Sequence, residues 1–111
     1  MLVLALLLSF AAEADRVYGA PLVPGARKEE EGRYQAMRSY DDALEFYERL
    51  FKGNAKIRWK KIIHQPQVKA VHMMNLQPVA GGWSGINLYE VNGQTHLYVL
   101  KLEEKPATKK R

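Results

Sequence analysis

An Asn92-Gly93 pair between two runs of β-forming residues constrains the fold of this chain more than any other feature. Asn-Gly tolerates the positive φ angles of a two-residue type I′ turn, so the run from Trp83 to Leu102 is predicted to form a β-hairpin. Such a turn also sets the register of the two strands. The expected pairs are Val91 with Gln94, Glu90 with Thr95, Tyr89 with His96, Leu88 with Leu97, Asn87 with Tyr98, and Ile86 with Val99.

The two faces of this hairpin differ in character, because successive side chains of a strand point to opposite sides. One face is aliphatic and is predicted to join the core; it carries Ile86, Leu88, Leu97 and Val99. The other face combines aromatic rings with hydrogen-bonding groups; it carries Asn87, Tyr89, His96 and Tyr98. We interpret this second face as a candidate ligand-binding surface. His72 would join it if Val71 and Met73 point into the core.

The segment between Ser39 and Gly53 shows the pattern of an amphipathic helix. Ser39 can cap the first turn, where Asp41 and Asp42 also place negative charge favoured by the helix dipole. Apolar residues recur at spacings of three and four; they are Tyr40, Ala43, Leu44, Tyr47, Leu50 and Phe51. Gly53 is expected to end the helix as a left-handed cap. This stripe and the aliphatic face of the hairpin would cover one another.

Three further strands are expected. Residues 33–38 form a short strand, and residues 57–65 form a longer one in which the pair Ile62-Ile63 predicts a bulge near Lys61. Pro66 ends that strand, and residues 68–76 form the next, either face of which would suit the core. The predicted fold is therefore α+β, in the order β-α-β-β-β-β. It has an antiparallel sheet of four to five strands with one amphipathic helix packed on one face.

The two ends of the chain differ from its middle. Residues 1–14 are an apolar run ending in Ala12-Glu13-Ala14, which resembles a signal-peptide cleavage site, although no Lys or Arg precedes it. We expect a cleaved export signal at 1–14, with a buried N-terminal helix as the alternative, and no transmembrane span after cleavage. Residues 15–32 are predicted as an extended lead-in, 33–103 as a single domain and 104–111 as a basic disordered tail.

Charge and cysteine content restrict the classes of function. The chain has no Cys, which excludes disulfides, thiolate metal sites and cysteine nucleophiles. An export signal without disulfides favours a periplasmic or secreted bacterial protein. The formal net charge is +5, but the cations are scattered and the only basic run is C-terminal. Nucleic-acid binding is therefore not expected, and association with the envelope or nucleic acid through charge alone is kept as a lesser hypothesis.

No catalytic constellation is evident. The segment Gly81–Gly85 lacks the Lys-Ser/Thr of a phosphate loop, and its serine lacks the first glycine of a hydrolase elbow. No two of the three histidines have the spacing of a helical metal-ligand pair. We therefore predict no catalytic residue, metal or cofactor. The enzymatic alternative is a small metal-dependent hydrolase that uses His72 and His96, which would have to converge from different strands.

Several segments together suggest a resemblance. They are the apolar leader, Pro24-Gly25-Ala26, the helix run Tyr40 to Tyr47, the strand Val68 to His72, and the run Gly82 to Glu90. In these segments the chain resembles small exported bacterial domains without an assigned activity. The resemblance implies an exported α+β domain and supplies no catalytic residues.

The leading hypothesis is a non-enzymatic periplasmic or secreted binding or interaction domain. Its ligand would be an unidentified protein or small molecule. The predicted binding residues are Asn87, Tyr89, His96, Tyr98 and His72. Oligomeric state is left open by the sequence.

Overall fold

The computed structural model describes residues 16–103. The export signal predicted at 1–14 and the basic tail predicted at 104–111 lie outside the described residues. Within the described range, no helix combines the length and the apolar character needed to cross a bilayer.

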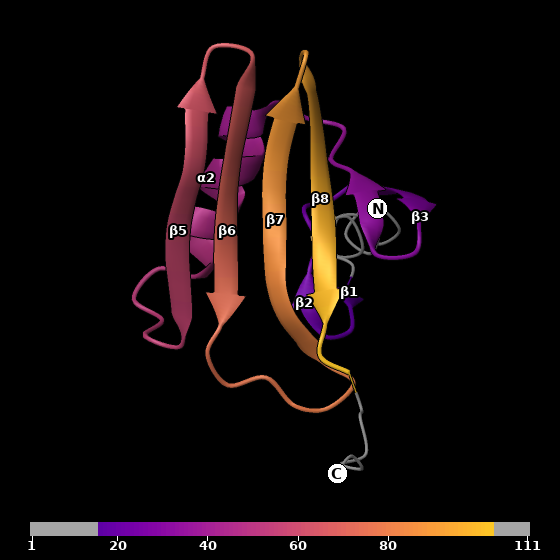
Figure 1. Ribbon diagram of the computed structural model, residues 1–111, viewed down its shortest axis with the longest axis vertical. Helices are drawn as coiled ribbons and strands as arrows, with labels where there is room; N and C mark the ends of the chain where they lie inside the picture. Colours follow the sequence, from indigo (N-terminus) through magenta and orange to yellow (C-terminus); the bar gives the residue numbers. More distant parts are fainter. Residues whose placement is uncertain (1–15, 104–111) are drawn as a thin grey trace, which may run out of the picture.

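Within residues 16–103, a six-stranded antiparallel sheet with one helix on its inner face makes up most of the fold (Figure 1). The strand order is β3-β4-β8-β7-β6-β5, and a separate two-stranded sheet pairs β1 with β2. The strands are β1 (Arg16–Val17), β2 (Ala20–Pro21), β3 (Arg27–Glu30), β4 (Arg33–Gln35), β5 (Ile57–Gln65), β6 (Val68–Asn75), β7 (Trp83–Val91) and β8 (Gln94–Lys101); the helix is α2 (Tyr40–Leu50). The α+β class with an antiparallel sheet and one covering helix is confirmed.

The β7–β8 hairpin has the predicted register at all six pairs, from Val91 with Gln94 to Ile86 with Val99. Asn92 and Gly93 both have positive φ angles, 51° and 86°, as a type I′ turn requires. The four aliphatic side chains of its inner face are buried in the core: Ile86, Leu88, Leu97 and Val99. The turn chemistry was therefore sufficient to place this face correctly.

Strands β5 and β6 also follow the pattern, and the structure decides which face of β6 is buried. The predicted bulge in β5 lies between Lys61 and Ile63. Val71 pairs with Leu88 and Met73 with Ile86, so these β6 side chains share the core face of β7. His72 consequently lies on the outer face of the sheet.

The predicted strand count and order are wrong in the N-terminal third of the chain. Residues 15–32, predicted as an extended lead-in, contribute β1, β2 and β3, so the observed order is β-β-β-β-α-β-β-β-β. The four residues of β3 are all exposed, and such an edge strand shows no alternation of apolar and polar residues to reveal it. The strand predicted at 33–38 ends at Gln35, and Met37 beyond it has a φ of 61°.

Helix α2 begins as predicted, with the Ser39 hydroxyl accepting a hydrogen bond from the Asp42 amide at 3.0 Å. Its buried positions are Tyr40, Ala43, Tyr47 and the capping residue Phe51. Leu50, predicted in the apolar stripe, is 46% exposed because it lies at the edge of the stripe, away from the sheet. The helix ends at Leu50, and Gly53 follows in the left-handed region at φ 73°.

Tyr47 joins the helix to the N-terminal segment. Its ring is fully buried and its hydroxyl donates a 2.8 Å hydrogen bond to the carbonyl of Pro21. Burial raises the pKa of Tyr47 well above its usual range, so the hydroxyl stays a donor. Leu22 and Val23, next in the chain after Pro21, are buried in the same core. The segment before the helix is thus held over the inner face of the sheet.

Replacement of Leu97 by Ala should lower the free energy of unfolding by about 2–5 kcal/mol, because it opens a cavity in the core. Leu50→Ala removes the same atoms from an exposed position and should cost under about 1 kcal/mol. Urea unfolding followed by circular dichroism measures both. Equal costs for the two variants would contradict the described core.

The Tyr47→Phe variant should be destabilised by about 1–3 kcal/mol, since the buried Pro21 carbonyl then loses its donor. Tyr98→Phe removes the same hydroxyl from a side chain that is 37% exposed, and we expect little change. Thermal unfolding compares the pair. A Tyr47→Phe protein as stable as the unmodified chain would show that this bond does not hold the N-terminal segment.

Candidate functional site

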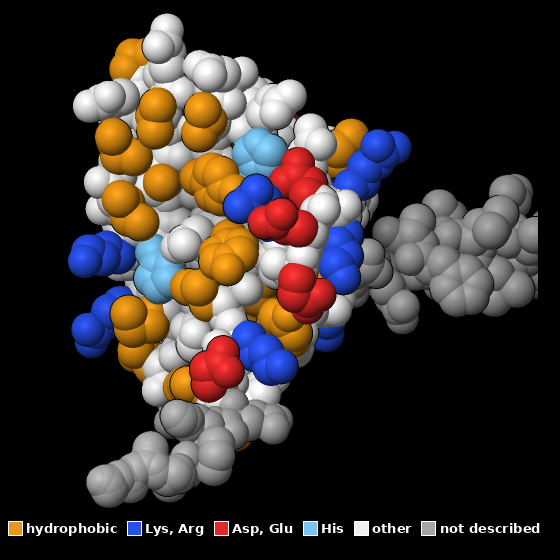
Figure 2. Space-filling view, turned by 45° about the vertical axis from the view of Figure 1, so that its right-hand side comes forward, with side chains coloured by type: hydrophobic (Ala, Val, Ile, Leu, Met, Phe, Trp, Pro, Cys, Tyr) orange, Lys and Arg blue, Asp and Glu red, His pale blue; other side chains and the backbone are white. Residues whose placement is uncertain are grey.

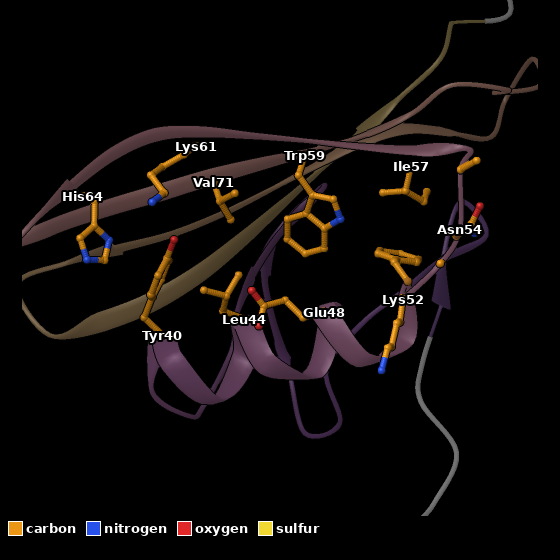
Figure 3. A pocket seen from close by; sticks show the side chains of 13 residues that line it. Tyr40, Leu44, Glu48, Lys52, Asn54, Ile57, Trp59, Lys61, His64 and Val71 are labelled. Carbon is orange, nitrogen blue, oxygen red and sulfur yellow. The ribbon is translucent and has the colours of Figure 1, made fainter.

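An open cavity of about 770 Å³ lies between helix α2 and strand β5. We call it the α2–β5 groove (Figure 3). It is lined by Tyr40, Leu44, Glu48, Phe51, Lys52, Gly53, Asn54, Ala55, Ile57, Trp59, Lys61, His64 and Val71. These residues come from the helix, the loop that follows it, and the inner faces of β5 and β6.

The groove exists because the helix does not reach across the whole sheet. The helix makes its main sheet contacts with β7, and β6 separates that strand from β5. Among the described residues, the helix therefore packs less closely on the inner face of β5 than on β7. Trp59 and Ile57 point inward from β5 but stay only half-buried.

One end of the groove is aromatic and apolar. The Trp59 ring extends from β5 toward the helix (Figure 3) and meets the Phe51 ring edge-on, with 6.5 Å between the centroids. Phe51 in turn stacks on Trp83 at 6.1 Å and on the buried Tyr47 at 5.9 Å. This cluster holds Trp59 against a packed wall, and it offers an apolar surface to a ligand.

The other end of the groove is polar, with Tyr40, Lys61 and His64 grouped there (Figure 3). Strict alternation would put Lys61 and His64 on opposite faces of β5, because they are three residues apart. The bulge between Lys61 and Ile63 shifts the register, so that Lys61 pairs with Val71 and His64 with Lys69. Both side chains consequently line the inner face. The irregularity in β5 thus creates the polar end.

The lysines near this end differ in whether they form an ion pair with a carboxylate. Lys69 lies 3.9 Å from the Glu90 carboxylate and its ammonium lies over the Tyr40 ring, 5.8 Å from the centroid. None of the ion pairs formed within residues 16–103 includes Lys61 or Lys52. Burial, followed by nearby carboxylates, raises the pKa of Tyr40, so its hydroxyl remains a donor at neutral pH.

The residues predicted as a binding surface lie together on the opposite, outer face of the sheet. The rings of Tyr89 and His96 stack with centroids 5.2 Å apart. Nδ1 of His72 lies 2.5 Å from Oδ1 of Asn87, and Asn87 pairs with Tyr98 across the strands. Figure 2 shows apolar side chains and histidines on this side of the molecule. The ligand-binding role of these five residues stays a prediction.

The histidines proposed for the enzymatic alternative have other partners on this face. His72 contacts Asn87, while His96 lies 3.2 Å from a carboxylate oxygen of Glu29 in β3. Strand β7 separates the strands that carry them. In the described part of the chain, no three His, Asp or Glu side chains are grouped so that they would hold a metal ion.

The sequence analysis did not predict the α2–β5 groove, although the alternation along residues 57–65 contains one signal for it. Alternation along this strand predicts Trp59 inward and the cations in water; Trp59 does face the groove, and Lys61 lines the groove while it remains exposed. Alternation counted through the predicted bulge would have put Lys61 and His64 on the side of Trp59. The position of the helix on the sheet, which leaves the inner face of β5 open, is not indicated by any pattern in the sequence.

Comparisons of this chain with protein-family models, with curated proteins and with solved structures found no match.

The outer face has one close approach that a substitution can test. A Cβ added at Gly85 would lie 2.6 Å from Cε1 of His72 and 3.3 Å from the Met73 carbonyl oxygen. Gly85→Ala should therefore displace the His72 ring from Asn87 and cost about 1–3 kcal/mol of stability. In a His72→Ala background the same change should cost less, by about 0.5–3 kcal/mol. Denaturant unfolding of the unmodified protein, the two single variants and the double variant measures this difference. An equal loss of stability from Gly85→Ala in both backgrounds would contradict the described contact.

Proposed function

We propose that this protein is a non-enzymatic binding domain whose α2–β5 groove takes a small, largely apolar molecule. The observation that carries the proposal is the cavity of about 770 Å³ with aromatic and aliphatic walls. Ligand sites are typically clefts of roughly 300–1,000 Å³ with mainly apolar linings and few polar groups. The apolar residues 1–14 support a periplasmic or secreted location for this binding.

The two ends of the groove suit binding because one would bury the apolar part of a ligand and the other would orient the ligand. Trp59 and Phe51 would remove apolar ligand surface from water, at roughly 25 cal/mol for each Å² buried. Tyr40, Lys61 and His64 at the other end would orient the bound molecule. A groove that is bordered on one side by the edge strand β5 also lets a ligand enter without unfolding the core.

Binding is favoured over catalysis by the side-chain contacts. Within residues 16–103, no hydrogen bond joins the side chains of two groove residues, so the groove holds no assembled pair of nucleophile and base. The alternative of a metal-dependent hydrolase at His72 and His96 has less support, because each of these rings already contacts a partner.

The uncharged dye Nile red tests the proposal, since its fluorescence rises in an apolar site. Leu44→Trp should fill the groove from the helix side and weaken dye binding about tenfold, a change of about 1.4 kcal/mol. Ala55→Trp should do the same from the loop, at an exposed position where folding is not at risk. Leu76→Trp adds an equal ring to an exposed site outside the groove and should leave binding unchanged.

Circular dichroism spectra and melting temperatures would show that all three variants are folded. The proposal fails if the unmodified protein does not bind the dye. It fails equally if both groove variants bind the dye as well as Leu76→Trp does.

A further inference from the structure

We infer that the natural ligand of the α2–β5 groove is an amphipathic carboxylate, with its apolar body against Trp59 and its carboxylate at Lys61. This inference rests on the proposed function of the groove as a binding site. It adds the chemical class of the ligand and the direction in which the ligand lies.

The polar end supplies the donors that a carboxylate needs. Lys61 contributes an ammonium group, and Tyr40 contributes a hydroxyl whose raised pKa keeps its proton. His64 adds a ring N–H from the same strand, because the β5 bulge turns it to the inner face. A carboxylate has two oxygens that accept several hydrogen bonds at once, and bonds that involve charged groups are the stronger ones.

Charge complementarity selects an anion over a cation at this end. The adjacent pair of Lys69 and Glu90 already neutralises itself at 3.9 Å, so the charge of Lys61 is not offset there. Glu48 is the one carboxylate among the groove residues, and it is placed one helical turn before Lys52. In Figure 3, Glu48 lies near the middle of the groove beside Leu44, whereas Lys52 lies at the far end near Asn54 and His64 at the opposite end. Lys61 and Lys52 thus outnumber the one carboxylate of the groove lining. A ligand with a positive head would meet the ammonium of Lys61.

The apolar end determines the rest of the ligand. Trp59, Phe51 and Ile57 present ring faces and aliphatic carbon, and the ammonium of Lys52 points away from the Trp59 ring (Figure 3). An alkyl chain would bury its methylene groups there, and each buried methylene would improve affinity about fourfold. A ligand of the fatty-acid type combines such a chain with a single terminal carboxylate.

The test is displacement of Nile red by three ligands of equal chain length: decanoate, decanol and decylammonium. We expect decanoate to bind about three- to fivefold more tightly than decanol, as a solvent-exposed ion pair allows, and decylammonium to bind most weakly. Lys61→Met should remove the preference for decanoate over decanol. Lys52→Met makes the same change of charge away from the polar end and should preserve the preference. Added salt should reduce the preference of the unmodified protein for decanoate over decanol, because the head group is exposed to solvent.

The outcomes separate this inference from the proposed function. If Nile red binds but decanoate and decanol displace it equally well, the groove is a binding site and the carboxylate inference is wrong. If Lys52→Met abolishes the preference and Lys61→Met does not, the orientation is reversed and the inference is likewise overturned. If neither the dye nor any of the three ligands binds, the proposed function itself fails.

Discussion

The packing of helix α2 on the aliphatic face of the β7–β8 hairpin is the interaction on which the rest of the structure depends. Ile86, Leu88 and Leu97 are fully buried in one core with residues of the helix and of the N-terminal segment. Burial of apolar surface is the dominant favourable term in folding, and a hairpin alone does not bury it. The helix therefore has to lie over the middle of the sheet. That position leaves the inner face of β5 open and so creates the α2–β5 groove.

The bulge in β5 gives that open face its chemistry. A regular strand would leave Lys61 facing inward and turn His64 outward, whereas the extra residue brings both to the inner face. Lysine and a bulge on an edge strand also discourage pairing with other chains. The same irregularity thus protects the edge of the sheet and positions two polar groups at one end of an otherwise apolar groove. Protection of the edge is compatible with the ligand orientation that we propose.

Prediction succeeded where a local rule fixes the geometry and failed where burial is decided by distant segments. Asn92-Gly93 was enough to predict six strand pairs, and Ser39 was enough to locate the start of the helix. The β3 strand was missed because an exposed edge strand contains no buried face to leave a pattern. The exposure of Leu50 was missed because helical spacing identifies the apolar residues on one side of the helix. It does not show how many of them the sheet buries.

The sequence by itself determined the hairpin register, the helix and the bulge, because turn chemistry, capping and alternation act over a few residues. Tertiary structure alone decided that Val71 and Met73 face the core and that β4 pairs with β8. It also decided which strands the helix covers. Each of those outcomes depends on how segments far apart in the chain share a limited apolar surface. The candidate site is a consequence of this packing, because the groove forms where the sheet extends beyond the part that the helix covers.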